Sequence, residues 1–145
     1  MLPEEVEKLA QQLREPKGKE GIAIGESIYQ TNLSMIRHAI YHLNIQPKDS
    51  ILEIKHGNGR HISKMMNTTT SLQYTGIEIS SIMHQQSMAN NEEWVNNKQV
   101  ELLLYDGKTI PFQAATFNKV FADNTLYFWE DSLAFLGEIY RVLKK

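Results

Sequence analysis

The segment at residues 50–61 constrains the fold of this chain more than any other part of the sequence. Ile51 to Ile54 form a short apolar stretch that predicts a buried strand, and a Gly57-Asn58-Gly59 turn follows closely. A strand that ends in a glycine turn and then leads into a helix lets a nucleotide approach bare backbone. The segment therefore predicts an α/β domain with a nucleotide site at this turn.

Two acidic residues point to the kind of nucleotide. Glu53 lies on the first predicted strand, and Glu78 lies near the end of the next apolar strand, at residues 74–79. A carboxylate at the end of the second strand is placed to accept both hydroxyls of a ribose. Together with the glycines, the two acids indicate a cofactor that contains adenosine.

Four interpretations of the glycine turn compete. A dinucleotide site requires G-x-G-x-x-G or A, and Ile62 stands where the small residue should be. A P-loop requires G-x-x-x-x-G-K-[ST], and the chain has no such run. The turn that binds S-adenosylmethionine (SAM) has an acid on the strand four residues before Gly-x-Gly, which Glu53 and Gly57 satisfy. An ordinary strand-turn-helix with a glycine bend is the fourth interpretation.

The rest of the chain resembles the class I SAM-dependent methyltransferases, in particular the small-molecule methyltransferase branch. The segments that carry the resemblance stand in the family's order: Ile51–Gly59, Gly76–Met83, Tyr105–Phe112, Phe117–Trp129 and Glu138–Lys144. The resemblance implies an α/β Rossmann-like three-layer sandwich, with a parallel sheet of about four strands in the order 3-2-1-4. It also implies SAM as the cofactor and a small molecule as the methyl acceptor.

The resemblance assigns cofactor contacts residue by residue. Glu53 would face the methionine end of SAM, Glu78 would accept the ribose hydroxyls, and Asp106 would receive the adenine amino group. The full predicted cofactor site comprises Glu53, Lys55, Gly57, Asn58, Gly59, Glu78, Ile79, Met83, Asp106, Gly107, Asn124 and Thr125. No catalytic base is assigned, because much of the catalysis of methyl transfer from a sulfonium can come from proximity and orientation.

Two departures from the family pattern keep a second function open. Lys55 replaces the first motif glycine, where a β-carbon costs about 1–2 kcal/mol if φ is positive. Its ammonium could instead pair with the cofactor's carboxylate. The chain also reaches Lys145 before the family's fifth strand. Both departures favour the alternative of a non-catalytic or degenerate SAM-binding module. An NAD(P)-dependent oxidoreductase is a third possibility, which Ile62 disfavours.

The hydrophobic pattern predicts the order of the elements. The predicted strands lie at 51–55, 73–79, 100–105 and 118–123, and helices are predicted between and after them at 59–66, 81–95 and 132–144. An amphipathic stripe from Leu2 to Leu13 predicts a helix that ends at Arg14, and a longer helix is expected to carry one apolar face from Tyr29 to Leu43 and to stop before Pro47. Residues 15–21 are rich in Gly, Pro and charge and predict a linker. We therefore expect an N-terminal helix and linker at 1–21 and a SAM-binding domain at 22–145 that ends before its fifth strand.

Composition narrows the range of partners. The net charge is −2, with acids and bases interspersed, so no nucleic-acid partner is expected. No apolar run approaches the ~20 residues of a membrane span, and a cytoplasmic protein without a membrane partner is expected. The chain has no cysteine. His38 and His42 share a helix face, and His56 and His61 flank the glycine turn, but neither pair has a third ligand, so no metal is expected. Val120 and Phe121 lie on a predicted edge strand, which predicts self-association.

Overall fold

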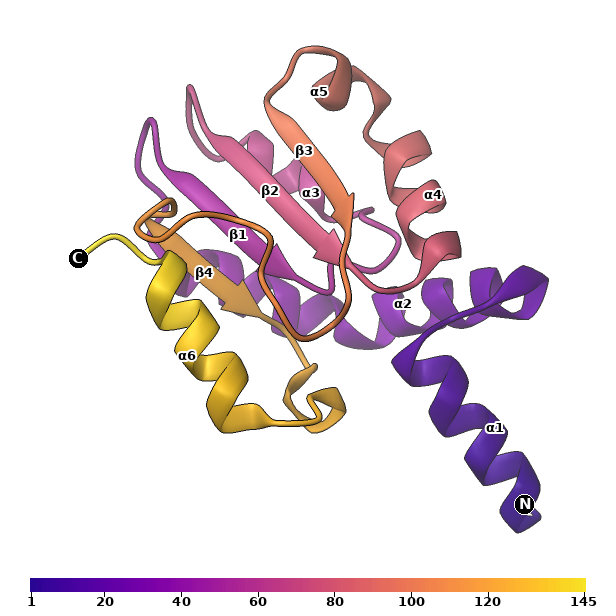
Figure 1. Ribbon diagram of the computed structural model, residues 1–145. Coiled ribbons are helices and arrows are strands. Elements are labelled where there is room, and N and C mark those ends of the chain that lie inside the picture. The colour runs from indigo at the N-terminus through magenta and orange to yellow at the C-terminus, as the bar shows by residue number, and fades with distance from the viewer.

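Helices and strands alternate along the chain in the computed structural model, which describes all 145 residues (Figure 1). The helices are α1 (Pro3–Arg14), α2 (Gly18–Leu43), α3 (Ile62–Met66), α4 (Ser81–Asn90), α5 (Glu92–Asn96) and α6 (Ser132–Val142). The strands are β1 (Ser50–Ile54), β2 (Gln73–Glu78), β3 (Val100–Leu104) and β4 (Lys119–Ala122). A short 3₁₀ helix, η1 (Leu126–Phe128), follows β4.

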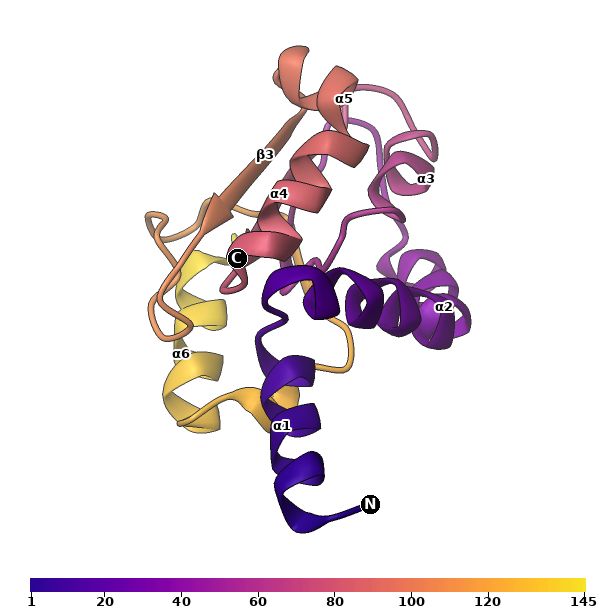
Figure 2. The same ribbon diagram turned by 90° about the vertical axis from the view of Figure 1, so that its right-hand side faces the viewer.

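The strands form one parallel sheet in the order β3-β2-β1-β4, which confirms the predicted order. In the register of this sheet, Ile51 of β1 stands opposite Tyr74 of β2 on one side and Lys119 of β4 on the other. Helices α2 to α5 lie on one side of the sheet and α6 lies on the other (Figure 2). The predicted three-layer sandwich is therefore confirmed.

Each face of the sheet has its own apolar core, because successive residues of a strand point to opposite faces. Ile51 packs with Ile62 and Met65 of α3, whereas Leu52 packs with Phe135 and Val142 of α6. Glu53 follows the same alternation and faces the side of α3. The alternation therefore places a carboxylate within the packed layer beneath the glycine turn.

Helix boundaries differ from the prediction at three places. The predicted linker was wrong beyond Lys17, because α2 already begins at Gly18. A β-carbon on Gly21 would lie 2.8 Å from a backbone atom of Pro16, so this glycine serves a tight helix contact. The helix predicted at 81–95 is divided at Asn91, whose side-chain amide donates to the carbonyl of Gly59. The helix predicted from residue 59 begins at Ile62.

Exposed apolar side chains occur on several elements, among them α1 and α6. Helix α1 has no buried residue, and it projects away from the sheet (Figure 1). On α6, Leu133, Leu136 and Tyr140 are 82%, 50% and 64% exposed and share one helix face. Strand β4 pairs only with β1, so it lies at the sheet edge as predicted. None of the helices combines the length and apolar character needed to cross a membrane.

Candidate functional site

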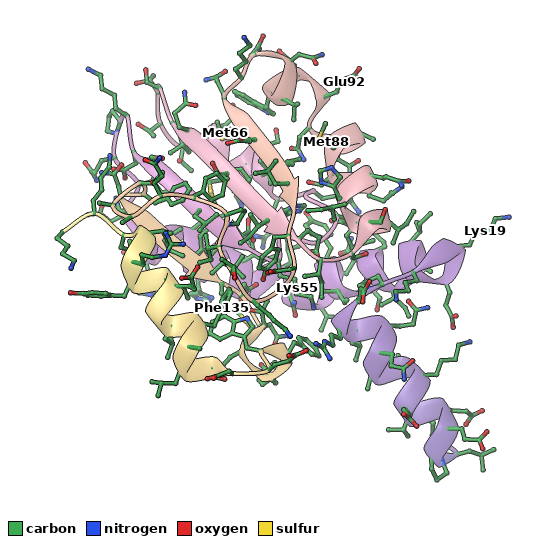
Figure 3. The ribbon with its side chains drawn as sticks, in the orientation of Figure 1. Lys19, Lys55, Met66, Met88, Glu92 and Phe135 are labelled. Carbon is green, nitrogen blue, oxygen red and sulfur yellow. The ribbon has the colours of Figure 1, made fainter.

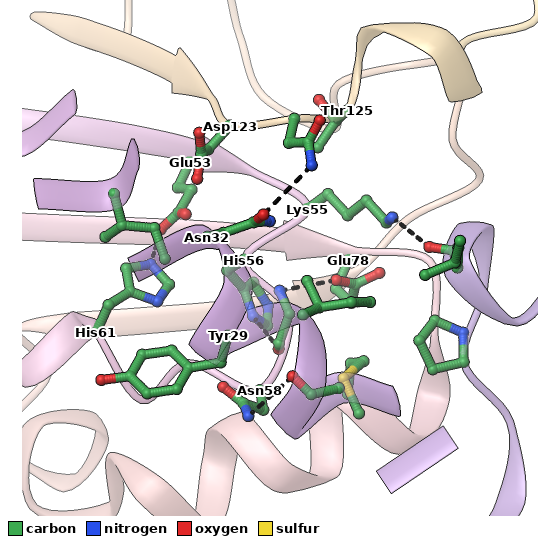
Figure 4. Close-up of a pocket in the computed structure, with 18 of the residues that line it drawn as sticks. Tyr29, Asn32, Glu53, Lys55, His56, Asn58, His61, Glu78, Asp123 and Thr125 are labelled. Carbon is green, nitrogen blue, oxygen red and sulfur yellow. Dashed lines mark hydrogen bonds and ion pairs between the residues drawn. The ribbon is translucent and has the colours of Figure 1, made fainter. Parts of the chain in front are cut away.

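A cavity of about 330 Å³ opens at the carboxyl ends of β1, β2 and β4, below α2 (Figure 4). Parallel strands present their carboxyl ends at one edge, where ligands bind in such sheets. The predicted site residues that line this cavity are Glu53, Lys55, Gly57, Asn58, Glu78, Met83, Asn124 and Thr125. The structure therefore brings together residues from most of the predicted segments.

A second cavity of about 270 Å³ adjoins the first. Ile79, Asp106 and Gly107 line it, so the remaining predicted residues gather here rather than in the first cavity. Lys55 and Thr125 line both cavities, as does Phe128 of η1. We call these three residues the joint.

Gly59 is the predicted site residue that lines neither cavity. Its φ is +69°, and a β-carbon there would lie 2.1 Å from Oγ of Ser87 on α4. This glycine therefore permits close packing of the turn against α4 and does not contact the cavity.

Gly57 and Asn58 form the part of the turn that faces the cavity. Gly57 has a φ of +62° and open space where a β-carbon would stand, so its backbone is bare to a ligand. Its N–H donates to Oε2 of Glu78 at 3.0 Å. Asn58 accepts from the N–H of Arg60 and donates its amide to the carbonyl of Gly25. These bonds fix the turn to both β2 and α2.

Glu78 is fully buried and is satisfied by backbone donors. Its Oε1 accepts from the N–H groups of Ile79 and Ser80, at 2.8 and 3.1 Å. Its Oε2 accepts from Gly57, as above. Carboxylate oxygens each have two lone pairs, so Oε2 retains capacity for a ligand hydroxyl. The predicted ribose contact stays a prediction.

Glu53 has a different set of partners. Its Oε2 lies 2.6 Å from Nε2 of His61 and accepts from the hydroxyl of Tyr74. Burial raises the pKa of Glu53, but the facing His61 and Tyr74 outweigh burial and hold it below its usual value. Burial likewise opposes charge on His61, yet Glu53 and, more weakly, Asp123 raise its pKa above the ordinary value. The two side chains form a buried ion pair.

Two buried polar atoms on the cavity wall have no protein partner: Nε2 of His56 and Oγ1 of Thr125. Nδ1 of His56 lies 2.9 Å from the carbonyl of Gly57, which leaves Nε2 as an acceptor. Burial lowers the pKa of His56, which keeps the ring neutral. Buried polar groups are almost always hydrogen-bonded, so these two atoms lack the partner that such groups normally have.

Lys55 crosses the joint between the cavities. Its φ is +61°, and its Nζ donates to the carbonyl of Leu13 at 2.8 Å. The same atom lies 4.1 Å from the ring centroid of Phe128. Burial lowers the pKa of Lys55, and the charge of Glu78 opposes that effect. In Figure 3, Lys55 lies at the strand ends between α1 and α6, whereas Lys19 points outward.

Asp106 and Asn124 have partners of their own. Oδ1 of Asp106 accepts from the N–H groups of Lys108 and Thr109, both at 2.7 Å, so this carboxylate forms the turn after β3. Asn124 has a φ of +55°, and its amide donates to Oδ1 of Asn32 on α2 at 3.4 Å. The two bonds to Asp106 fix the turn that lines the second cavity. The Asn124 bond connects the end of β4 to α2.

The sequence motifs do not identify every residue that lines the first cavity. Among those they miss are residues of the two N-terminal helices: Leu13, Ile28, Tyr29, Asn32 and Ile36. His56 and His61 were considered only as metal ligands, and no cluster of three ligating side chains occurs in the structure. The spacing of eight residues between Glu53 and His61 was a usable signal, because it joins a strand to the first turn of the next helix.

Sequence comparison gives one family and two curated relatives. The family described as Methyltransferase domain matches residues 52–145. The methyltransferase YdaC of Bacillus subtilis is 29% identical over 113 residues, which are 78% of this chain and 60% of YdaC. A second Bacillus subtilis protein, which carries the name methyltransferase YrhH, is 34% identical over 104 residues, which are 70% of this chain and 56% of YrhH. The chain thus spans less than two thirds of either relative.

Structural comparison agrees on the fold. A SAM-dependent methyltransferase structure from Methanococcus maripaludis superposes with a TM-score of 0.71 and 21% identity. The match covers 89% of this chain and 62% of that protein. At this identity the likeness concerns the fold, and it supports the Rossmann-like arrangement described above.

Proposed function

Since this chain belongs to the methyltransferase domain family, we propose that it forms the cofactor-binding part of a SAM-dependent methyltransferase that acts on a small molecule. One observation carries the proposal: nearly all predicted cofactor residues line two adjoining cavities at the carboxyl ends of the strands. Bound SAM supplies a methyl group on a positively charged sulfur, and transfer then depends on how the protein orients the two reactants.

The second cavity fits the adenosine part of SAM. Gly107 has a φ of +81° and presents a backbone without a side chain, while Ile79 offers an apolar surface for a ring. Asp106 uses one oxygen for the turn and retains the other for an amino group. Glu78, at the end of β2, stands between this cavity and the glycine turn.

The first cavity fits the methionine part of SAM. The bare backbone of Gly57 and the unpartnered atoms of His56 and Thr125 supply polar contacts. Asp123, half-buried on the same wall, is a second carboxylate that can face an ammonium. Burial and then the charge of Glu53 raise the pKa of Asp123, which a bound cation would reverse.

Helix α2 supports a small acceptor. Ile28, Tyr29 and Ile36 line the first cavity along α2. An apolar wall of this kind, with a few polar groups such as Asn32, is typical of small-molecule sites. The cavity volume of about 330 Å³ lies at the lower end of the range for such sites.

Isothermal titration of the whole chain tests the cofactor. We expect S-adenosylhomocysteine or SAM to bind in preference to NAD. A dinucleotide site needs a small residue at the position that Ile62 occupies. Ile62 is fully buried in the core on the α3 side, and its side chain prevents the helix from approaching the strand closely. Micromolar binding of NAD without binding of either adenosyl ligand at millimolar concentration would overturn the proposal.

The residue that favours the alternative function, a SAM-binding module without catalysis, is Lys55. Its side chain fills the joint through which SAM must pass from one cavity to the other. We expect weak SAM affinity in the natural chain and higher affinity in Lys55→Gly, because glycine adopts a positive φ freely and leaves the joint open. A lower affinity in Lys55→Gly would instead show that the lysine binds the cofactor's carboxylate.

A further inference from the structure

The joint between the two cavities is made by Lys55, Thr125 and Phe128. Figure 4 shows the Lys55 side chain crossing the site toward the carbonyl of Leu13. Any single ligand that occupies both cavities must therefore pass beside the Lys55 ammonium. The charge of the ligand at that point then affects its binding.

The backbone conformation of Lys55 and two contacts fix the ammonium at the joint. The left-handed backbone directs the side chain across the site, and the Leu13 carbonyl accepts a hydrogen bond from Nζ at 2.8 Å. Leu13 lies in the last turn of α1, where the free carbonyls carry partial negative charge. The Phe128 ring adds a cation–π contact at 4.1 Å. A lysine held in this way stays at the joint without a ligand.

No carboxylate forms a direct ion pair with Lys55, and of the acids that line the two cavities all except Asp123 have other partners. Glu130 pairs with Arg14 and Lys108, and Glu15 pairs with Lys17. The carboxylates of Asp106 and Glu78 accept backbone N–H groups. The positive charge of Lys55 is therefore only partly offset, and it acts on whatever group a ligand places beside it.

SAM places a positive charge there. Its sulfonium joins the adenosine to the methionine part, so adenosine in the second cavity and methionine in the first put the sulfur at the joint. Two like charges a few ångströms apart near a protein surface change an equilibrium constant by about tenfold or more. S-adenosylhomocysteine has the same two parts joined by a neutral sulfur and avoids this repulsion.

We propose that Lys55 makes this site select adenosine thioethers, with S-adenosylhomocysteine as the representative ligand, over the sulfonium SAM. This inference rests on the proposed function, because it requires adenosine in the second cavity and methionine in the first.

Isothermal titration of the whole chain with SAM, S-adenosylhomocysteine and adenosine tests the inference. Lys55→Met removes the charge and keeps the chain length, whereas Lys55→Arg keeps the charge. We expect the ratio of the SAM to the S-adenosylhomocysteine dissociation constant to fall about tenfold or more in Lys55→Met. The ratio should stay unchanged in Lys55→Arg and in Lys64→Met, an exposed lysine on α3. Adenosine ends before the sulfur and serves as the internal reference.

The outcomes separate the two claims. If both adenosyl ligands bind and the ratio in Lys55→Met equals that of the natural chain, the inference is wrong and the proposed function stands. If neither adenosyl ligand binds the natural chain or any variant, the proposed function fails and the inference fails with it. Should circular dichroism show that Lys55→Met does not fold, Lys55→Gln provides the same uncharged comparison.

Discussion

The central strands β1 and β2 and the edge strand β4 are built in opposite ways. Every residue from Ile51 to Ile54 and from Tyr74 to Glu78 is buried, whereas no residue of β4 is fully buried. The central strands also bury two carboxylates, each with several hydrogen-bond partners. The difference shows that the two buried carboxylates of the proposed site stand on fully packed strands, whereas the edge strand β4 leaves surface exposed.

The largest expected effect concerns the Glu53 pair in the central strands. Glu53→Ala leaves His61 and the Tyr74 hydroxyl buried without their partner, and breaking such a pair costs about 3–5 kcal/mol. Urea unfolding followed by circular dichroism measures the change. The matched control is Glu101→Ala, an exposed glutamate on β3, which should change stability by no more than about 0.5 kcal/mol. Equal effects of the two substitutions would contradict the contrast between buried and edge positions.

The next effect concerns Glu78, the carboxylate that is bonded to backbone. Glu78→Gln keeps one acceptor oxygen for the turn and removes the charge. We expect its affinity for S-adenosylhomocysteine to fall by about 1–3 kcal/mol, because charge-assisted hydrogen bonds to the ribose are lost. Isothermal titration measures the loss, with Glu92→Gln at the exposed start of α5 as the control. An unchanged affinity would remove Glu78 from the ligand site.

A smaller effect concerns the pH dependence of the Glu53–His61 pair. The folded-state pKa of Glu53 is lowered, so its stabilisation is fully present above the ordinary value of 4.5 and is lost as pH falls through the folded pKa. The folded-state pKa of His61 is raised, so its stabilisation is fully present below 6.5 and is lost as pH rises through the folded pKa. We therefore expect the melting temperature to exceed that of His61→Gln most between these two values.

Thermal unfolding across this pH range measures the difference. His38→Gln, an exposed histidine on α2, is the control and should follow the natural chain at every pH. A difference between the natural chain and His61→Gln that does not vary with pH would contradict the ion pair and leave only a packing role for the histidine.

The smallest effect on stability is expected for a substitution on α6, beside the β4 edge. The same substitution should nevertheless change self-association. Leu136 belongs to the exposed face of α6, and Leu136→Glu should alter stability by no more than about 0.5 kcal/mol. We expect the natural chain to self-associate through this side, and Leu136→Glu to reduce that association. Light scattering over a concentration series measures it, with Met88→Glu on α4 as the control. A strict monomer at high concentration would contradict the prediction.

Much of the fold could be predicted because its signals are local. The apolar stretch from Ile51 to Ile54, the glycines of the turn and the repeated strand-helix units predicted a parallel sheet, and the family resemblance implied its order, which the structure confirms as β3-β2-β1-β4. The prediction of the linker failed because glycine occurs both in flexible linkers and at close helix contacts. The sequence predicts a linker over Gly18 and Gly21, yet both residues belong to α2, and the missing side chain of Gly21 allows close contact with Pro16.

For the site, the sequence by itself determined which residues end the strands. Because parallel strands end at one edge, Gly57, Glu78, Asp106 and Thr125 had to lie near one another. The tertiary structure alone decided what those residues contact. The Lys55 bond to Leu13 joins positions 42 residues apart, and no local pattern encodes a contact between a strand end and a distant helix carbonyl. That contact divides the site in two, because it forms only when α1, α2 and the sheet are packed together.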